Sequence, residues 1–404
     1  MAEPYQAPDD FTAQLRTTVT QVMDVADVTI GRNEKYAVRF RGQLKIDSVE
    51  AYDLVAAAFR THNFTAFFRV ESDQHVILAL PGVIDPRPSN AWVNYVLILL
   101  TIFSAFYTGA MYSYDGPATD LVQVLLEGLL RIYTGWPFAV GLLSILLAHE
   151  FGHYIAARRH GENVTLPYFI PMPYPISPFG TLGAIIAMKA PIRNRRVLLD
   201  IGISGPLAGF VVAIPVLIIG LMRSHVETIA IPPGGGISLE GNSIIYLLFK
   251  FLVFGQLLPA PASYGAGGAL LHWIRYFFTS TPLPIGGKDV FLDQMAWAGW
   301  AGLLVTGLNL IPAGQLDGGH TLYVLLGGRV RKLLPVILVT LVALGFVWSG
   351  WWLWAGLIYF LNQRHAELLD EITPLDPRRR VLAIITLILF FLVITPVPLT
   401  VVAG

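Results

Sequence analysis

Residues 138–148 read FAVGLLSILLA, an apolar run without a charged side chain, and residues 149–153 continue as HEFGH. The wider segment Trp136–Ala157 has the roughly 20 residues that a membrane-spanning helix needs. Two histidines and a glutamate are costly inside a bilayer unless they pair or bind a ligand. The stretch therefore predicts a membrane helix that carries a functional site.

The composition of the whole chain agrees with a membrane protein. The 404 residues are 54% hydrophobic and 13% charged, whereas soluble domains carry about 25% charged residues. The formal net charge is zero, which gives no sign of nucleic-acid binding. The absence of cysteine excludes a disulfide framework and a thiolate metal site.

Several further segments are apolar enough to enter a bilayer. Leu333–Leu361 is long for one span and holds Ser349-Gly350, so we expect two short helices in a hairpin. Ile244–Leu258 contains Lys250 and is expected to be interfacial or re-entrant, as is Leu270–Phe278. The predicted fold is a polytopic α-helical membrane protein of about six to eight spans with re-entrant segments, plus a small N-terminal α+β domain. The remaining predicted spans are Ala91–Met111, Val197–Met222, Gln294–Ile311 and Val381–Val402.

The N-terminal domain is expected to cover residues 1–88, because most of the regular polar–apolar alternation lies there. The composition changes after Pro86-Arg87-Pro88, so the membrane-embedded domain is expected to cover residues 89–404. In the first domain we expect helices at Phe11–Val25 and Ser48–Thr61, and strands at Asp27–Ile30, Ala37–Gln43, Asn63–Glu71 and Gln74–Leu80.

Basic residues in short loops predict the orientation, since such loops favour the cytoplasmic side. The basic loop residues are Arg158, Arg159, Lys189, Arg193, Arg195, Arg196, Arg329, Arg331, Lys332, Arg378, Arg379 and Arg380. All these basic residues can lie on one side of the membrane if Leu333–Leu361 is a hairpin. We therefore expect a cytoplasmic N-terminal domain and an active site near the cytoplasmic face. No Ser/Arg-rich transit segment is visible in the first half, which favours a prokaryotic plasma membrane.

The HEFGH segment has the spacing of a zinc site. His149 and His153 are four residues apart and project from one face of a helix. Glu150 can reach a water at the metal without binding the metal itself, which is the H-E-x-x-H arrangement of zinc proteases. Such a pentapeptide also occurs by chance in soluble helices. Its place in an apolar helix favours the metal site.

A catalytic zinc takes three protein ligands, so one more is needed. The best candidate is Asp317 in NLIPAGQLDGGH, residues 309–320. Pro312 and the glycines at 314, 318 and 319 are expected to break the helix there, and broken backbone at membrane depth is tolerated where it lines a cavity. Taken alone, Asp317 would be interpreted as a solvated aspartate at the end of a helix. The presence of the histidine helix favours its interpretation as a metal ligand.

The two motifs together resemble the site-2 protease family of intramembrane zinc proteases, over roughly residues 137–320. The resemblance implies one Zn²⁺ per chain, held by His149, His153 and Asp317, with Glu150 as the catalytic base. It also implies that Asn309 positions substrate or stabilises the oxyanion. Residues 40–45, FRGQLK, are similar to the G-N-L-R segment of the plastid and cyanobacterial branch named for ethylene-dependent gravitropism deficiency and yellow-green leaves.

The proline-rich segment Leu166–Met188 is too broken to span the membrane, and its end, from Thr181 on, suits a short strand. The resemblance implies a re-entrant β-like loop beside the active site. A free strand edge there could hold an unfolded substrate segment. The expected substrate-binding residues are Thr181, Leu182, Gly183 and Ala184.

The expected function is therefore hydrolysis of peptide bonds within or near transmembrane segments of membrane proteins, with the lipid bilayer as its setting. One alternative is a membrane protease of the prenyl-protein protease type, which takes a downstream glutamate as third ligand; no comparable E-x-x-x-D helix is visible. A metal-binding transporter or regulatory scaffold is the alternative outside enzymes. It predicts polar residues on many spans, whereas here they are concentrated in two.

Overall fold

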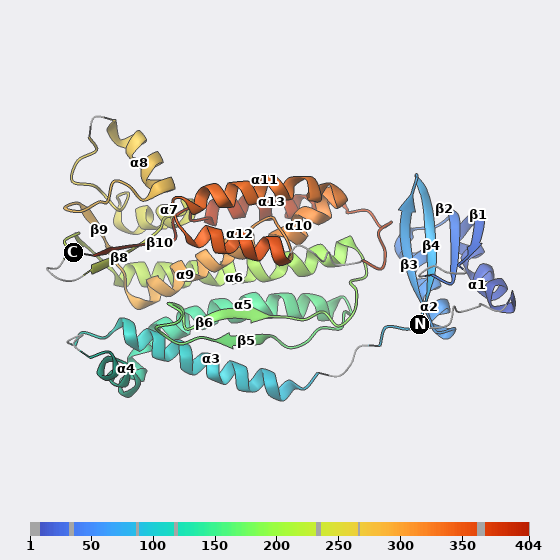
Figure 1. The fold of residues 1–404 in the computed structure, drawn as a ribbon, viewed down its shortest axis with the longest axis horizontal. Helices are drawn as coiled ribbons and strands as arrows, with labels where there is room; N and C mark the ends of the chain where they lie inside the picture. Colours follow the sequence, from blue (N-terminus) through green and yellow to red (C-terminus); the bar gives the residue numbers. More distant parts are fainter. Residues whose placement is uncertain are drawn as a thin grey trace.

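The computed structural model describes residues 9–31, 36–85, 89–116, 120–231, 236–265, 267–361 and 368–403. These residues are mostly helical, with a smaller α+β region at the N-terminal end of the chain (Figure 1). The predicted combination of a helical body and an N-terminal α+β region is thus confirmed. The expected domain boundary at Pro86-Arg87-Pro88 lies outside the described residues.

The N-terminal region is an antiparallel four-stranded sheet with two helices packed against it. Its strands lie in the order β1-β2-β4-β3, and Phe40, Phe59 and Phe68 are completely buried in its core. The Asp47 carboxylate accepts a hydrogen bond from the Val49 amide and caps the second helix. The elements are α1 (Asp9–Val22), β1 (Met23–Ile30), β2 (Val38–Leu44), α2 (Ser48–Thr61), β3 (Phe64–Glu71) and β4 (Gln74–Pro81).

Three helices within the described ranges are long and apolar enough to cross a membrane. They are α3 (Ala91–Tyr112), the stretch Ile132–Arg159 that contains α5 (Trp136–Arg159), and α6 (Arg195–Arg223). Large apolar side chains on their outer faces, such as Leu99 and Val211, are 65% exposed. An exposed apolar surface of this extent on long helices fits contact with lipid.

Three of the remaining helices of the body, at Gln294–Asn309, Asp317–Leu326 and Pro377–Val393, pack against α6. The predicted hairpin within Leu333–Leu361 is present as α11 and α12, which pack against each other. The elements are α9 (Gln294–Asn309), α10 (Asp317–Leu326), the 3-10 turn Gly327–Arg329, α11 (Val330–Gly345), α12 (Gly350–Leu361) and α13 (Pro377–Val393).

The predicted last span, Val381–Val402, is wrong at its end. The helix α13 stops at Val393, and after Pro396 and Pro398 the chain continues as strand β10 (Leu399–Ala403). Proline cannot continue a helix because it has no amide hydrogen. The strand instead pairs with β8 (Gly236–Glu240), far away in the sequence.

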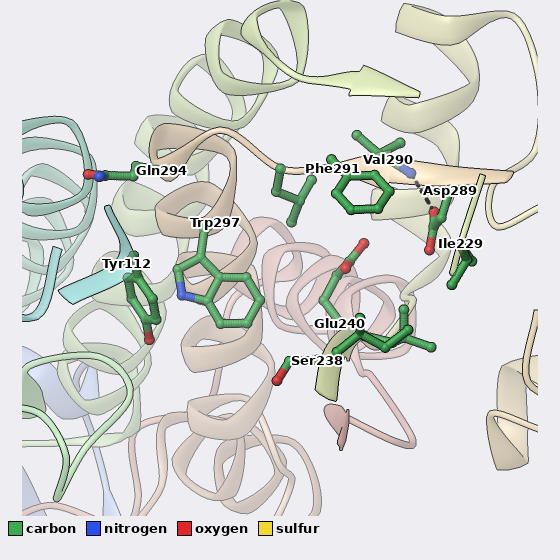
Figure 2. A pocket seen from close by; sticks show the side chains of 12 residues that line it. Tyr112, Ile229, Ser238, Glu240, Asp289, Val290, Phe291, Gln294 and Trp297 are labelled. Atoms are coloured by element: carbon green, nitrogen blue, oxygen red, sulfur yellow. Dashed lines mark hydrogen bonds between the residues drawn. The ribbon is translucent and has the colours of Figure 1, made fainter. Parts of the chain in front are cut away.

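The end of the body opposite the N-terminal region is built from short elements (Figure 1). Its buried Lys250 lies 3.5 Å from Glu240 and 3.7 Å from Asp289. Glu240 and Asp289 border a cavity of about 340 Å³, whose other wall includes Tyr112 and Trp297 (Figure 2). The short elements here are α4 (Leu121–Leu130), the 3-10 turn Ile132–Gly135, β7 (His225–Thr228), α7 (Ile244–Phe254), α8 (Gly268–Thr279) and β9 (Lys288–Phe291).

Candidate metal centre

Three side chains from two helices converge inside the helical body. The helix α5 presents His149 and His153 on one face, and α10 begins at Asp317. The Asp317 Oδ2 atom lies 3.4 Å from Nε2 of His149 and 3.3 Å from Nε2 of His153. The two imidazole Nε2 atoms are 3.2 Å apart. The three candidate ligands that the sequence singled out thus lie together, although they come from distant parts of the chain.

The spacing of these atoms fits a tetrahedral metal ion. Ligand atoms about 2.0–2.1 Å from a zinc ion, at tetrahedral angles, lie about 3.3 Å from one another. The three measured separations are within 0.1 Å of that value. Two imidazoles and a carboxylate are also a common zinc donor set, and they leave one position open for water. The group could therefore hold a metal ion.

A backbone carbonyl fixes the orientation of one imidazole. The Nδ1 atom of His153 lies 2.7 Å from the carbonyl oxygen of Ile201 in α6. A carbonyl only accepts, so Nδ1 carries the hydrogen and Nε2 presents its lone pair toward Asp317. No feature of the sequence could identify this contact, because it involves the main chain of another helix.

Glycines allow α6 to approach the histidine helix closely. A Cβ atom at Gly205 would lie 2.1 Å from His153 Nε2, and one at Gly209 would lie 3.1 Å from the Cβ of His149. On α5, a Cβ at Gly152 would meet the Ser204 carbonyl at 2.6 Å. Gly205 and Gly209, four residues apart in α6, therefore allow close helix packing directly against the candidate ligands.

The segment before Asp317 is broken, but not at every predicted residue. The helix α9 ends at Asn309, and Pro312 and Gly314 lie in the irregular connection that follows. Gly318 and Gly319, expected to break the helix, lie inside α10. Their hydrogens face the carbonyls of the connection: a Cβ at Gly318 would lie 2.0 Å from the Leu310 oxygen. Because glycine has no side chain, these two positions can pack directly against the connection. The prediction that Gly318 and Gly319 break the helix is wrong.

A cavity of about 300 Å³ opens beside the cluster. Its walls include His149, Glu150, His153, Asn309 and Asp317, and Glu150 is only 7% exposed. The Asn309 amide nitrogen lies 3.3 Å from His149 Nε2. The predicted base and the predicted asparagine thus both border the space next to the three ligand atoms. Gln315 and His320, which the sequence did not single out as site residues, also line it.

The four expected substrate-binding residues belong to β6 (Thr181–Ile185), which pairs with β5 (Tyr168–Pro171). Only Ala184 of the four lines the cavity. The Thr181 hydroxyl is used inside the hairpin, since it donates to the Ile170 carbonyl and accepts from the Gly183 amide. Leu182 is 63% exposed and Gly183 has a φ of 95°. The structure therefore brings the strand to the site through Ala184 and its neighbour Ile185.

Comparison with known proteins agrees with this site. The sequence profile of peptidase family M50 matches residues 137–348, a stretch that includes both halves of the cluster. The chain belongs to peptidase family M50. No solved structure matches the chain.

Relatives of this M50 chain carry the name zinc metalloprotease. It is 30% identical to the probable zinc metalloprotease EGY2, chloroplastic, of Arabidopsis thaliana, over 89% of the chain and 60% of that protein. It is 28% identical to the probable zinc metalloprotease EGY1, chloroplastic, of Oryza sativa subsp. japonica, over 78% of the chain and 52% of that protein. The chain therefore spans between half and two thirds of the length of these curated relatives. The similarity to this plastid branch, expected from residues 40–45, is confirmed.

The comparisons correct the predicted location. We expected a prokaryotic plasma membrane and a cytoplasmic side for the site and the N-terminal region. The relatives of this M50 chain are named as chloroplastic proteins, which points to a plastid membrane instead. The prediction had rested on a single negative observation, that no transit-like segment is visible in the first half of the chain.

Proposed function

We propose that this chain is an intramembrane zinc protease, which hydrolyses peptide bonds within or near transmembrane segments of membrane proteins. The observation that carries the proposal is the tetrahedral spacing of His149, His153 and Asp317 beside Glu150, on and against a helix long enough to span a membrane. The names of the relatives support zinc as the ion. A bilayer setting makes membrane-protein segments the natural substrates.

Each protein group at the site has a separate task. A zinc ion there would polarise the scissile carbonyl and lower the pKa of a water at the open position. The carboxylate of Glu150 accepts the proton of the attacking water and passes it to the leaving amine. The Asn309 amide borders the same cavity and is placed to donate to the oxygen that gains negative charge. The Ile201 carbonyl keeps His153 in the tautomer that presents Nε2.

The substrate segment must be extended when it is cleaved, because a helical amide is shielded by its own turn. The strand β6 is placed to hold such a segment, since Ala184 and Ile185 line the cavity that also contains Glu150. Pairing with a strand edge gives affinity without sequence dependence, because main-chain groups make the hydrogen bonds. We assign substrate contact to the Ala184 end of β6 rather than equally to Thr181, Leu182, Gly183 and Ala184.

The finer architecture follows the same proposal. We infer about six to eight membrane segments, because α9 and α13 pack against α6, and the α11–α12 hairpin packs in turn against the segment after α9 and against α13. Residues 1–88 form a domain outside the bilayer, and residues 89–404 form the protease domain. The ends at which α6 and α13 begin lie toward the N-terminal region (Figure 1).

A cleavage assay on the full chain in liposomes tests the function. The substrate is a reporter protein with one transmembrane segment, and zinc content is measured in parallel. We expect Glu150→Gln to lower the cleavage rate by about 10²–10⁴-fold while it retains zinc, because the ligands stay in place. Glu127→Gln on α4, far from the cluster in sequence and structure, is the matched control and should cleave as wild type does.

Three outcomes would contradict the proposal. Cleavage by Glu150→Gln at the wild-type rate would show that this carboxylate is not the base. A wild type that binds zinc but cleaves no membrane substrate would favour a metal-binding transporter or scaffold, and a wild type without zinc would remove the metal centre itself.

A further inference from the structure

An ion-pair cluster joins the helices α5, α6 and α13. Asp200 of α6 receives two hydrogen bonds from the Arg379 guanidinium of α13, at 2.8 Å to Oδ1 and 2.6 Å to Oδ2. Its Oδ2 atom also lies 2.9 Å from Nε2 of His160, which caps the end of α5. Arg379 further donates to Asp376, the N-cap of α13, at 2.7 Å. A bidentate pair of this kind fixes both distance and orientation.

The cluster lies one residue away from the carbonyl that orients a candidate ligand. Asp200 is followed by Ile201, whose carbonyl oxygen is 2.7 Å from His153 Nδ1 and also accepts from the Ser204 hydroxyl at 2.7 Å. His160 stands two helical turns after His153 on α5. The carboxylate of Asp200 thus holds the end of α5 and the start of α13, and the next residue of α6 supplies the carbonyl that contacts His153.

The side chains concerned are only partly buried, which makes a purely stabilising role a weak explanation. The side chains of Asp200, Arg379 and His160 are 21%, 31% and 31% exposed. Ion pairs with this exposure contribute little to stability, typically about 0–1 kcal/mol. The bidentate geometry therefore fixes the relative position of the helices more than it adds to the free energy of unfolding.

We propose that Asp200 and Arg379 are positioning residues for the metal centre, which act on His153 through the Ile201 carbonyl. This inference rests on the proposed zinc-protease function. Loss of the bidentate contact lets the start of α6 shift against α5, and the hydrogen bond that holds the His153 imidazole then lengthens. Weaker orientation of a metal ligand commonly lowers metal affinity by about 10–100-fold.

The test compares Arg379→Gln and Arg379→Lys with Arg378→Gln in the full chain. Arg378 is exposed in the same helical turn, so its replacement removes the same charge without touching the Asp200 contact. Zinc affinity is measured by chelator competition, and the visible spectrum of the cobalt-loaded protein reports the ligand geometry. We expect both Arg379 variants to lose about tenfold in zinc affinity, with a changed cobalt spectrum. Lysine should not restore them, because it lacks the planar fork.

Three outcomes would contradict either the positioning role or the proposed function, and they can be told apart. Wild-type zinc affinity and an unchanged cobalt spectrum in the Arg379 variants would overturn the positioning role, even if their melting temperature falls. Equal losses in Arg378→Gln would overturn it as well, because the effect would then be one of general charge. A wild type that binds no zinc would instead overturn the proposed function. If Arg379→Gln does not fold, Arg379→Lys and Asp200→Asn decide by the same measurements.

Discussion

Gly205 of α6 and His153 of α5 occupy neighbouring volumes, so that any Cβ at position 205 would lie 2.1 Å from Nε2 and 2.5 Å from Cε1 of the imidazole. The ring therefore packs on bare backbone. The same ring is held from behind by the Ile201 carbonyl of α6 at 2.7 Å. One helix thus provides both the space for the imidazole and the hydrogen bond that orients it.

Gly205→Ala should displace the His153 imidazole and weaken zinc binding. The added methyl would overlap the imidazole ring, and overpacking of this kind costs about 1–3 kcal/mol. We expect a loss of zinc affinity of at least about tenfold, measured by chelator competition. Gly202→Ala is the control, since its Cβ would meet its nearest neighbour at an ordinary 3.5 Å. Equal zinc affinity in the two variants would contradict the packing argument.

Ala184→Trp should block cleavage without loss of zinc. Position 184 lines the cavity of about 300 Å³ next to Glu150, and an indole ring would fill much of that space. Cleavage of a membrane-tethered reporter should fall by more than about tenfold, while zinc content stays at the wild-type level. Leu182→Trp adds the same ring on an exposed position of β6 that does not line the cavity. Normal cleavage by Ala184→Trp would place the substrate elsewhere.

The candidate metal ligands could be proposed from the sequence because their pattern is local. The spacing of His149 and His153 places them on one helix face whatever surrounds them, and the broken segment after Asn309 is visible in Pro312 and Gly314. The contacts that support these residues were not visible. The Ile201 carbonyl belongs to the main chain, which every residue has, and the Asp200–Arg379 pair joins helices far apart in sequence.

The errors in the fold have a common physical origin. Gly318 and Gly319 have low helix propensity, yet α10 includes them because only glycine fits against the Leu310 and Ala313 carbonyls. The last apolar run was predicted to span as far as Val402, yet its end becomes a strand because β8 supplies a partner. In both cases a tertiary contact outweighs the local preference, and composition alone does not reveal the contact.

The segment after α12 extends the sheet of the N-terminal region. The Phe68 amide of β3 donates to the Leu369 carbonyl at 2.8 Å, and the Glu371 amide donates to the Phe68 carbonyl at 3.0 Å. Glu371→Pro removes one of these donors, which should loosen the attachment. We expect faster hydrogen–deuterium exchange in the peptide Phe64–Glu71.

Glu371→Ala is the matched control for that variant. It keeps the amide and removes only the carboxylate, which lies 3.9 Å from Arg69. Exchange in this control should remain close to wild type, because a partly exposed ion pair at that distance contributes little. If both variants exchanged alike, the main-chain pairing between β3 and residues 369–371 would not hold the two parts together.

Glu240 should make stability depend on pH near neutrality. Burial raises the pKa of its carboxyl to about 7, the Asp289 charge acts in the same direction, and the Lys250 ammonium opposes both. Glu240 and Asp289 line the cavity in Figure 2, and the Lys250 ammonium lies 3.5 Å from the Glu240 carboxylate. Between the usual carboxyl range and pH 7 the folded protein then holds a proton that the unfolded chain has released. The free energy of unfolding therefore falls as the pH rises through this window.

Glu240→Gln removes this titration and should flatten the pH dependence. The melting temperature of the wild type in detergent, relative to that of the variant, should decline from pH 4.5 to 7 and then level off. The total change corresponds to at most about 3 kcal/mol. Glu50→Gln, an exposed position on α2, should follow the wild-type curve. A constant difference between wild type and Glu240→Gln over this range would mean that Glu240 is ionised throughout, held by Lys250 and the Tyr246 hydroxyl at 2.9 Å.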